Sequence, residues 1–299
     1  MTGNRLYGPL HDVAGEAGYD AAHPPRAGFF TDTSVCIGCK ACEVACKEWN
    51  GLPDPEPGDL LLTGMSYDNT GALGANAWRH VAFIEQERPL LAAGVGDASG
   101  DEDGGQTRWL MASDVCKHCT HAACLDVCPT GALVRTEFAT VIVQHDICNG
   151  CAYCVSACPF GVIDRRIGDQ NTKNVGIAQK CTLCYDRLRD GLEPACAKAC
   201  PTQSIQFGDV DELRERAAAR LASLHDAGVP EARLYGEDPE DGVGGTGAMF
   251  LLLDEPEVYG LPPDPVVTTR DLPGMWKHVA IAAAGLAATA VALGLGGRR

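Results

Sequence analysis

The sequence predicts an α+β fold of two small modules, each holding two groups of cysteines, with an irregular cap and one C-terminal transmembrane helix. First, all 16 cysteines fall into four tight groups. Second, segments around these groups repeat, since CPTGAL at 128–133 recurs as CPTQSI at 200–205, and we expect the two modules to be related by a pseudo-twofold axis. Third, Val279 to Gly297 is an uncharged run, close to the ~20 residues that a helix needs to cross a bilayer.

We expect six segments along the chain. They are an N-terminal arm (1–34), the first cysteine group with an inserted acidic segment (35–110), a module with the second and third groups (111–180), the fourth group completing a module with the first (181–210), a helix and cap region (211–275), and the transmembrane helix (276–299).

Short apolar runs predict strands between the cysteine groups. HVAFIE at 80–85 and RWLMA at 108–112 are each expected to form a strand, and the two to pair. LVRTEFATVIVQ at 133–144 has the β-branched content of a hairpin. DVDELRERAAARLASL has Asp209 and Glu212 at capping-box spacing and predicts a surface helix. Its apolar face would hold Leu213, Ala217, Leu221 and Leu224.

Composition and charge limit the possible functions. A chain of 299 residues and 31.5 kDa can bury a core, so it needs no disulfide staples to fold. The formal charge of -16 argues against nucleic acid as a partner. The acidic residues are concentrated outside the cysteine-bearing core. Residues 116–200 hold nine Lys and Arg against eight Asp and Glu, whereas residues 201–275 hold five Lys and Arg against fifteen Asp and Glu. The N-terminus has no apolar run typical of a signal peptide, so we expect no export signal on this chain.

Each cysteine group is called a row here. Rows one and three have the C-x2-C-x2-C-x3-C spacing of bacterial ferredoxins, in which three thiolates wrap one [4Fe–4S] cluster and the fourth serves the cluster of another row. Pro129, Pro159 and Pro201 follow the last cysteine of their rows, and Lys47 stands there in row one. The rows are Cys36, Cys39, Cys42, Cys46; Cys116, Cys119, Cys124, Cys128; Cys148, Cys151, Cys154, Cys158; and Cys181, Cys184, Cys196, Cys200.

Crossed pairing predicts four [4Fe–4S] clusters with these sixteen cysteines as the iron ligands, in two ferredoxin-like modules. The expected ligand sets are Cys116, Cys119, Cys124 with Cys158; Cys148, Cys151, Cys154 with Cys128; and, by the same crossing, Cys36, Cys39, Cys42 with Cys200 and Cys181, Cys184, Cys196 with Cys46.

Other interpretations of the rows fit less well. Zinc sites consume two CxxC pairs at a time and have no use for a third cysteine at the same spacing, and short spacings give poor disulfide geometry. His118 and His121 lie in row two, but cysteine fills every ligand place, so we expect them on the solvent side or beside the cluster without binding iron. Lys40, Lys117, Lys180 and Lys198 each lie within two residues of a cysteine, as surface charges or as cations that raise a cluster's potential.

No catalytic motif accompanies the rows. The sequence has no Gly-rich phosphate loop, no nucleophile elbow and no HExxH. Four clusters with every iron held by cysteine leave no open coordination site for a substrate. The sequence therefore predicts a non-catalytic, electron-conducting chain.

The rows resemble a known family. CIGCKACEVACKEWN, CKHCTHAACLDVCPTGAL, CNGCAYCVSACPFGVI and KCTLCYDRLRDGLEPACAKACPTQSIQFG are similar to the iron–sulfur (beta) subunit of membrane-bound, molybdopterin-dependent formate dehydrogenases. The wider four-cluster family serves dimethyl sulfoxide, polysulfide and tetrathionate reductases. The narrower match rests on WN at 49–50, GVGGTGAMFLLL at 242–253, GLPPDPVV at 260–267, and a C-terminal helix preceded by Trp276 and Lys277. The resemblance covers about residues 33–298.

The resemblance implies electron transfer from a formate-oxidising alpha subunit, with a molybdenum or tungsten pterin, to a membrane cytochrome b (gamma) subunit and quinone. It also implies a single-pass membrane protein with its cluster domain outside the cytoplasm. The charges flanking the last helix, Arg270 and Lys277 against Arg298 and Arg299, do not fix its orientation. Two alternatives stay open: service to another molybdopterin reductase, and a metal-stapled scaffold without redox function.

Overall fold

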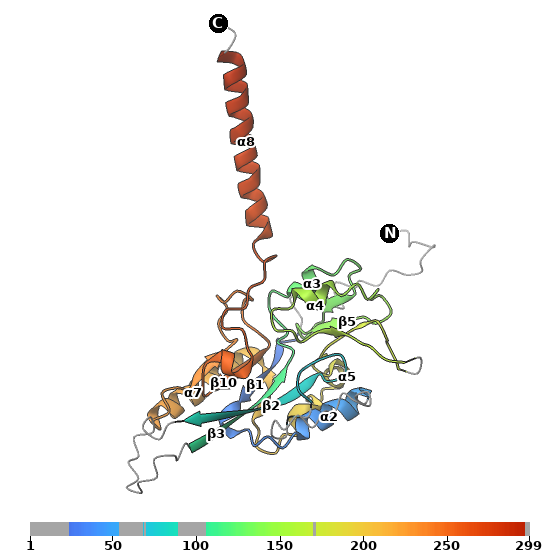
Figure 1. Ribbon diagram of the computed structural model, residues 1–299, viewed down its shortest axis with the longest axis vertical. Helices are drawn as coiled ribbons and strands as arrows, with labels where there is room; N and C mark the ends of the chain where they lie inside the picture. The colour runs from blue at the N-terminus through green and yellow to red at the C-terminus, as the bar shows by residue number, and fades with distance from the viewer. Residues whose placement is uncertain (1–23, 54–67, 69, 89–105, 170–171, 297–299) are drawn as a thin grey trace.

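The computed structural model describes residues 24–53, 68, 70–88, 106–169 and 172–296. Most of the predicted N-terminal arm and much of the inserted acidic segment (54–67, 69 and 89–105) lie outside these residues. Figure 1 shows a body of short strands and helices from which one long helix, α8 (Leu272–Gly296), projects.

A four-stranded sheet of order β8-β1-β10-β9 forms one part of the body. β1 runs parallel to β10, with Phe29 opposite Ala248, and antiparallel to β8, with Phe29 opposite Phe207. β9 closes the sheet antiparallel to β10. The strands are β1 (Ala27–Asp32), β8 (Ile205–Asp209), β9 (Arg233–Tyr235) and β10 (Ala248–Leu252).

Both faces of this sheet are buried because its side chains alternate between two cores. Phe29, Phe250 and Leu252 pack into the large core that also contains row cysteines. The opposite face packs against α7 (Val210–Asp226). The predicted helix is confirmed: Asp209 is its N-cap and accepts a hydrogen bond from the Asp211 amide (2.7 Å). Its buried face includes Leu213, Ala217 and Leu224, with Leu221 partly buried.

The predicted strand pairs are confirmed. HVAFIE lies in β2 (Arg79–Arg88) and RWLMA in β3 (Gln106–Val115), and the two pair antiparallel along their length. The segment at 133–144 forms β4 (Leu133–Arg135) and β5 (Val141–Val143), also antiparallel. A further small pair consists of β6 (Asp164–Arg165) and β7 (Ala178–Gln179).

Short helices accompany the cysteine rows and contact one another in two pairs. α2 of row one packs against α6 of row four, and α3 of row two packs against α4 of row three. Rows one and four therefore lie together, as do rows two and three. The helices of the rows and the remaining short elements are α2 (Ala41–Asn50), α3 (Ala123–Asp126), α4 (Tyr153–Ala157), α5 (Tyr185–Arg189), α6 (Ala195–Lys198), η1 (Thr33–Val35) and η3 (Pro256–Tyr259).

α8 contains one segment, Gly274–Val291, that is long and apolar enough to cross a membrane, with a mean hydropathy of 1.2. None of this segment is buried against the rest of the protein. Trp276 and Val279 are exposed on it. An exposed apolar helix is weakly consistent with the predicted membrane anchor.

Candidate iron–sulfur centres

All sixteen cysteines lie within the described residues and carry free thiols. In each row the first two cysteines lie on a loop, and the third lies in a helix. Two are exposed, Cys39 and Cys151; the other fourteen are buried or partly buried. The rows are thus held inside the body rather than displayed on its surface.

The residue before the second cysteine has the same backbone conformation in every row. Gly38, His118, Gly150 and Leu183 all have positive φ, between 44° and 71°. At Gly150 an added Cβ would lie 2.2 Å from the Gly176 carbonyl oxygen, so glycine is required there for space as well as for φ. The repeat seen in the sequence is therefore also a repeat of loop conformation.

Three cavities are each lined by three cysteines of one row and the fourth cysteine of another. The first is lined by Cys36, Cys39, Cys42 and Cys200; the second by Cys116, Cys119, Cys124 and Cys158; the third by Cys148, Cys151, Cys154 and Cys128. In the described part of the chain, no three His, Cys, Asp or Glu side chains meet at a position for a single metal ion. The donor set around each cavity is the all-thiol set that iron–sulfur clusters use.

The remaining four cysteines also lie near one another. The pKa of the Cys46 thiol is well above its ordinary value because of burial and then the nearby thiols of Cys181, Cys196 and Cys184. Asn50 donates to the Cys46 carbonyl oxygen (2.8 Å) and lies 3.7 Å from its sulfur. This contact gives a physical role to the asparagine of the WN pair.

Burial and mutual repulsion oppose the thiolate form in these groups. Burial raises the pKa of Cys42 and of Cys154 to about 11 and that of Cys124 to about 12, and neighbouring thiols add to each shift. A bound metal core supplies positive charge that stabilises the thiolates, and its binding releases the protons of the thiols. The residues present therefore fit a cluster better than they fit four free thiols.

Buried lysines bring positive charge to row two. Lys117 is fully buried, pairs with Asp114, and donates to the Val115 carbonyl oxygen (2.9 Å). Its Nζ also lies over the rings of Phe160 (5.3 Å) and Phe250 (4.9 Å). The surface-charge interpretation is wrong for Lys117.

Lys180 and His118 line the same cavity as Cys116 and its partners. Lys180 is 2% exposed and donates to the carbonyl oxygens of Cys181 (2.9 Å) and Val141, so it is not a surface charge either. His118 Nδ1 accepts a hydrogen bond from the Val141 amide (3.1 Å), which leaves the ring hydrogen on Nε2. Burial and then the positive charge of Lys180 hold the pKa of His118 well below its ordinary value.

The glycine-rich segment at 242–247 lies along row two. The amides of Thr120 and His121 donate to the carbonyl oxygens of Gly245 (3.0 Å) and Val243 (2.8 Å). The Gly247 amide donates to the Lys117 carbonyl oxygen (2.8 Å). This backbone ladder explains why the GVGGTG motif accompanies the cysteine rows.

Comparison with known proteins agrees with this geometry. Two family models, each described as a 4Fe-4S dicluster domain, match residues 35–132 and 107–210. The nitrate-inducible formate dehydrogenase iron-sulfur subunit of Escherichia coli is 40% identical over 264 residues, which is 86% of this chain and 80% of the relative. The chain belongs to the family of formate dehydrogenase iron–sulfur subunits. Its 4Fe-4S domains support electron transfer.

Other relatives place this family in a wider group. The formate dehydrogenase iron-sulfur subunit of Haemophilus influenzae is 40% identical over 279 residues, covering 90% of this chain and 80% of the relative. The B subunit of the anaerobic dimethyl sulfoxide reductase of Escherichia coli is 33% identical over 189 residues, covering 63% of this chain and 76% of the relative. The longer and closer match is to the formate dehydrogenase subunits.

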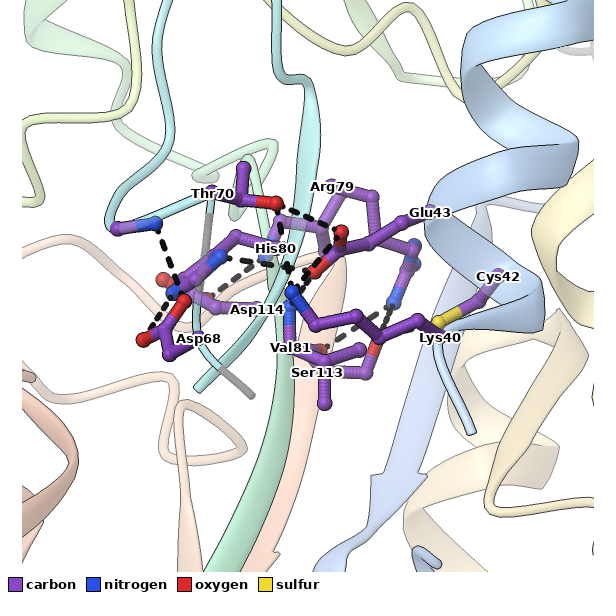
Figure 2. Close-up of polar contacts among 12 residues, drawn as sticks. Lys40, Cys42, Glu43, Asp68, Thr70, Arg79, His80, Val81, Ser113 and Asp114 are labelled. Carbon is purple, nitrogen blue, oxygen red and sulfur yellow. Dashed lines mark hydrogen bonds and ion pairs between the residues drawn. The ribbon is translucent and has the colours of Figure 1, made fainter. Parts of the chain in front are cut away.

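Sequence reasoning missed the buried charge of Arg79 and the network beside it. Figure 2 shows Arg79 of β2 close to Cys42 and Ser113, with Glu43 of α2 beside the same strand. Glu43 accepts from Thr70 Oγ1 (2.9 Å) and from the Val81 amide. Arg79 lies 37 residues beyond Cys42 along the chain, so no spacing rule could have linked it to the rows.

We predict that Asp114→Asn lowers the free energy of unfolding by about 3 kcal/mol, because it leaves the buried ammonium of Lys117 without its carboxylate. The measurement is the denaturant midpoint of the cluster-loaded protein under anaerobic conditions. Asp211→Asn is the matched control, since its partner Arg214 (2.8 Å) leaves the carboxylate 87% exposed; a change below about 1 kcal/mol is expected there. Equal effects of the two changes would contradict the role given to Lys117.

Proposed function

We propose that this chain carries electrons from a formate-oxidising catalytic subunit with a molybdenum or tungsten pterin to a membrane cytochrome b subunit and quinone. The observation that carries the proposal is the sorting of cysteines from different rows around shared cavities. The similarity to formate dehydrogenase subunits supplies formate as the donor. The chain itself conducts electrons and performs no bond chemistry.

The sixteen cysteines hold four [4Fe–4S] clusters in this proposal. Such a cluster takes up and releases one electron at a time, at a potential set by local charge and hydrogen bonds. The ligand sets are Cys36, Cys39, Cys42, Cys200; Cys46, Cys181, Cys184, Cys196; Cys116, Cys119, Cys124, Cys158; and Cys128, Cys148, Cys151, Cys154. Three cavities and the mutual proximity of the remaining four thiols support these sets.

Electrostatic coupling between thiols of different sets supports a linear order. Besides burial and other neighbours, the pKa of Cys42 is raised by Cys196 of the next set, and that of Cys181 by Cys116 of the set after it. Cys154 similarly raises the pKa of Cys124. The sets therefore follow one another as row one, row four, row two and row three, each named by the row that supplies three of its ligands.

The proposed modules follow from the same pairing. Rows two and three form one module at 111–180, and the fourth row at 181–210 completes the other with row one. The pairing of α2 with α6 and of α3 with α4 supports this division. The shared left-handed residue before each second cysteine supports a pseudo-twofold relation between the modules.

The module that holds rows two and three lies next to the N-terminal end of α8. Thr269 Oγ1 donates to Asp126 Oδ2 of α3 (2.6 Å), and Val267 packs against Ala123 and Val243. We therefore assign the row-three cluster, the last in the linear order, to the membrane side, and the row-one cluster to the catalytic subunit. α8 is the single membrane span in this proposal, with the cluster-bearing body outside the cytoplasm.

The first prediction from this proposed function concerns the donor. In membranes that contain the assembled complex, formate should bleach the cluster absorbance and reduce cytochrome b, and omission of this chain should uncouple formate oxidation from quinone. Dimethyl sulfoxide is the control substrate for the wider family and should not reoxidise the reduced clusters. A complex that ignores formate but turns over with another donor or acceptor would contradict this part of the proposal.

The second prediction concerns ligand crossing. Cys158→Ser should disturb the EPR signal of the cluster with Cys116, Cys119 and Cys124 more than that of the cluster with Cys148, Cys151 and Cys154, because Cys158 lines the former cavity. Cys128→Ser is the matched control and should do the reverse. Selective loss of the row-three cluster in Cys158→Ser would refute the crossing.

The third prediction concerns the anchor. Deletion of all residues after Pro273 should leave the clusters and formate-to-dye activity unchanged, because the membrane segment of α8 contributes nothing to the buried core. Quinone reduction should fall as the body detaches from the membrane. Because small residues dominate the helix, we expect it to insert by packing against the cytochrome b partner. A truncated protein that stays on the membrane and reduces quinone at the original rate would show that α8 is no anchor.

A further inference from the structure

Arg79 begins β2, and its side chain is buried, with 2% of the residue exposed. Its Nη1 donates to Ser113 Oγ (2.9 Å) and to the Ser113 carbonyl oxygen (3.2 Å). Ser113 Oγ in turn lies 3.2 Å from Cys42 Sγ (Figure 2). The guanidinium also lies 4.8 Å from the ring centre of Phe29. These contacts fix the cation in one place.

Two nitrogens of the same guanidinium, Nε and Nη2, are buried and have no hydrogen-bond partner among the described residues. Arginine stays charged in proteins, and a buried charged N–H group without an acceptor destabilises the fold. The sulfur atoms of a bound cluster would be acceptors for these two nitrogens. The fixed cation thus has two donors left for a cluster.

The groups that face Arg79 come from two ligand sets. Burial alone would lower the pKa of its guanidinium, but the thiols of Cys196, Cys42, Cys181 and Cys46 raise it above its ordinary value. Cys42 belongs to the proposed row-one set, and the other three belong to the proposed row-four set. The fold shows the same arrangement, because α2, which carries Cys42, contacts both β2 and the Cys196-bearing helix α6. One cation therefore lies beside two neighbouring sets.

We propose that Arg79 is a charge-compensating residue shared by the row-one and row-four clusters, raising both reduction potentials together. When one electron passes between them, one cluster is oxidised as the other is reduced, so negative charge leaves one side of the guanidinium and arrives on the other. A single cation between the two stabilises the electron on either side. It therefore favours the reduced form of both while leaving the difference between their potentials nearly unchanged.

This inference rests on the proposed function, and its test is a potentiometric EPR titration of the complete complex together with its iron content. Arg79→Gln removes the charge and should shift both clusters toward the oxidised form at least tenfold, which is 59 mV for a one-electron couple. Arg79→Lys keeps the charge and should shift them less. The row-two and row-three clusters should not move.

Arg216→Gln, which removes an exposed arginine of α7, is the matched control and should shift none of the four. The proposal is overturned if Arg79→Gln keeps full iron with unchanged potentials, if only one of the two clusters shifts, or if Arg79→Lys shifts both as far as Arg79→Gln. Wild-type protein without about sixteen irons per chain would instead refute the proposed function.

A variant that keeps every charge covers the case in which Arg79→Gln does not assemble. Ser113→Ala releases the guanidinium from its Oγ anchor and should lower both potentials in the same direction, by less than Arg79→Gln. A shift confined to the cluster of Cys42 would be explained by the direct Ser113–Cys42 contact alone, and it would overturn the shared role. Unchanged potentials would overturn it as well.

Discussion

The balance of charge around buried cysteines is the constraint on which the rest of this structure depends. Thiols enclosed away from water resist ionisation, and crowding them raises that resistance further, as the pKa values of Cys42, Cys124 and Cys154 indicate. Ligation requires the thiolate form. The interior must therefore supply positive charge, from the metal core and from the protein. Lys117, Lys180 and Arg79 are three such buried cations next to the rows.

Each buried cation is held by parts of the fold that lie outside the rows. Lys117 lies against Phe250 of the four-stranded sheet, and Arg79 is anchored by Ser113 across the β2–β3 pair. Lys180 donates to the carbonyl oxygen of Val141 in β5. The four-stranded sheet and the antiparallel strand pairs therefore have a second role besides packing against the cysteine loops. They position charges that the loops, with their few residues of regular structure, could not hold rigidly by themselves.

The sequence predicted those features that depend on local spacing. The cysteine rows, both strand pairs, the helix capped by Asp209 and the apolar C-terminal helix follow from patterns in short or neighbouring stretches of the chain. The role of Arg79 could not be predicted, because β2 carries it to row four, about a hundred residues later in the chain. The burial of Lys117 and Lys180 could not be predicted either, because a lysine beside a loop cysteine has the same sequence pattern whether it is exposed or buried.

The large negative charge of the chain does not decide the environment of the clusters. Most of the acidic excess lies in 201–275, where residues such as Asp211 and Glu215 are exposed. Exposed charges more than about 10 Å apart are largely screened at 0.1 M salt, whereas buried charges are screened much less. A few interior cations therefore outweigh a greater number of surface carboxylates at the position of the cysteines. In the proposed function, the interior cations rather than the acidic exterior therefore set the cluster potentials.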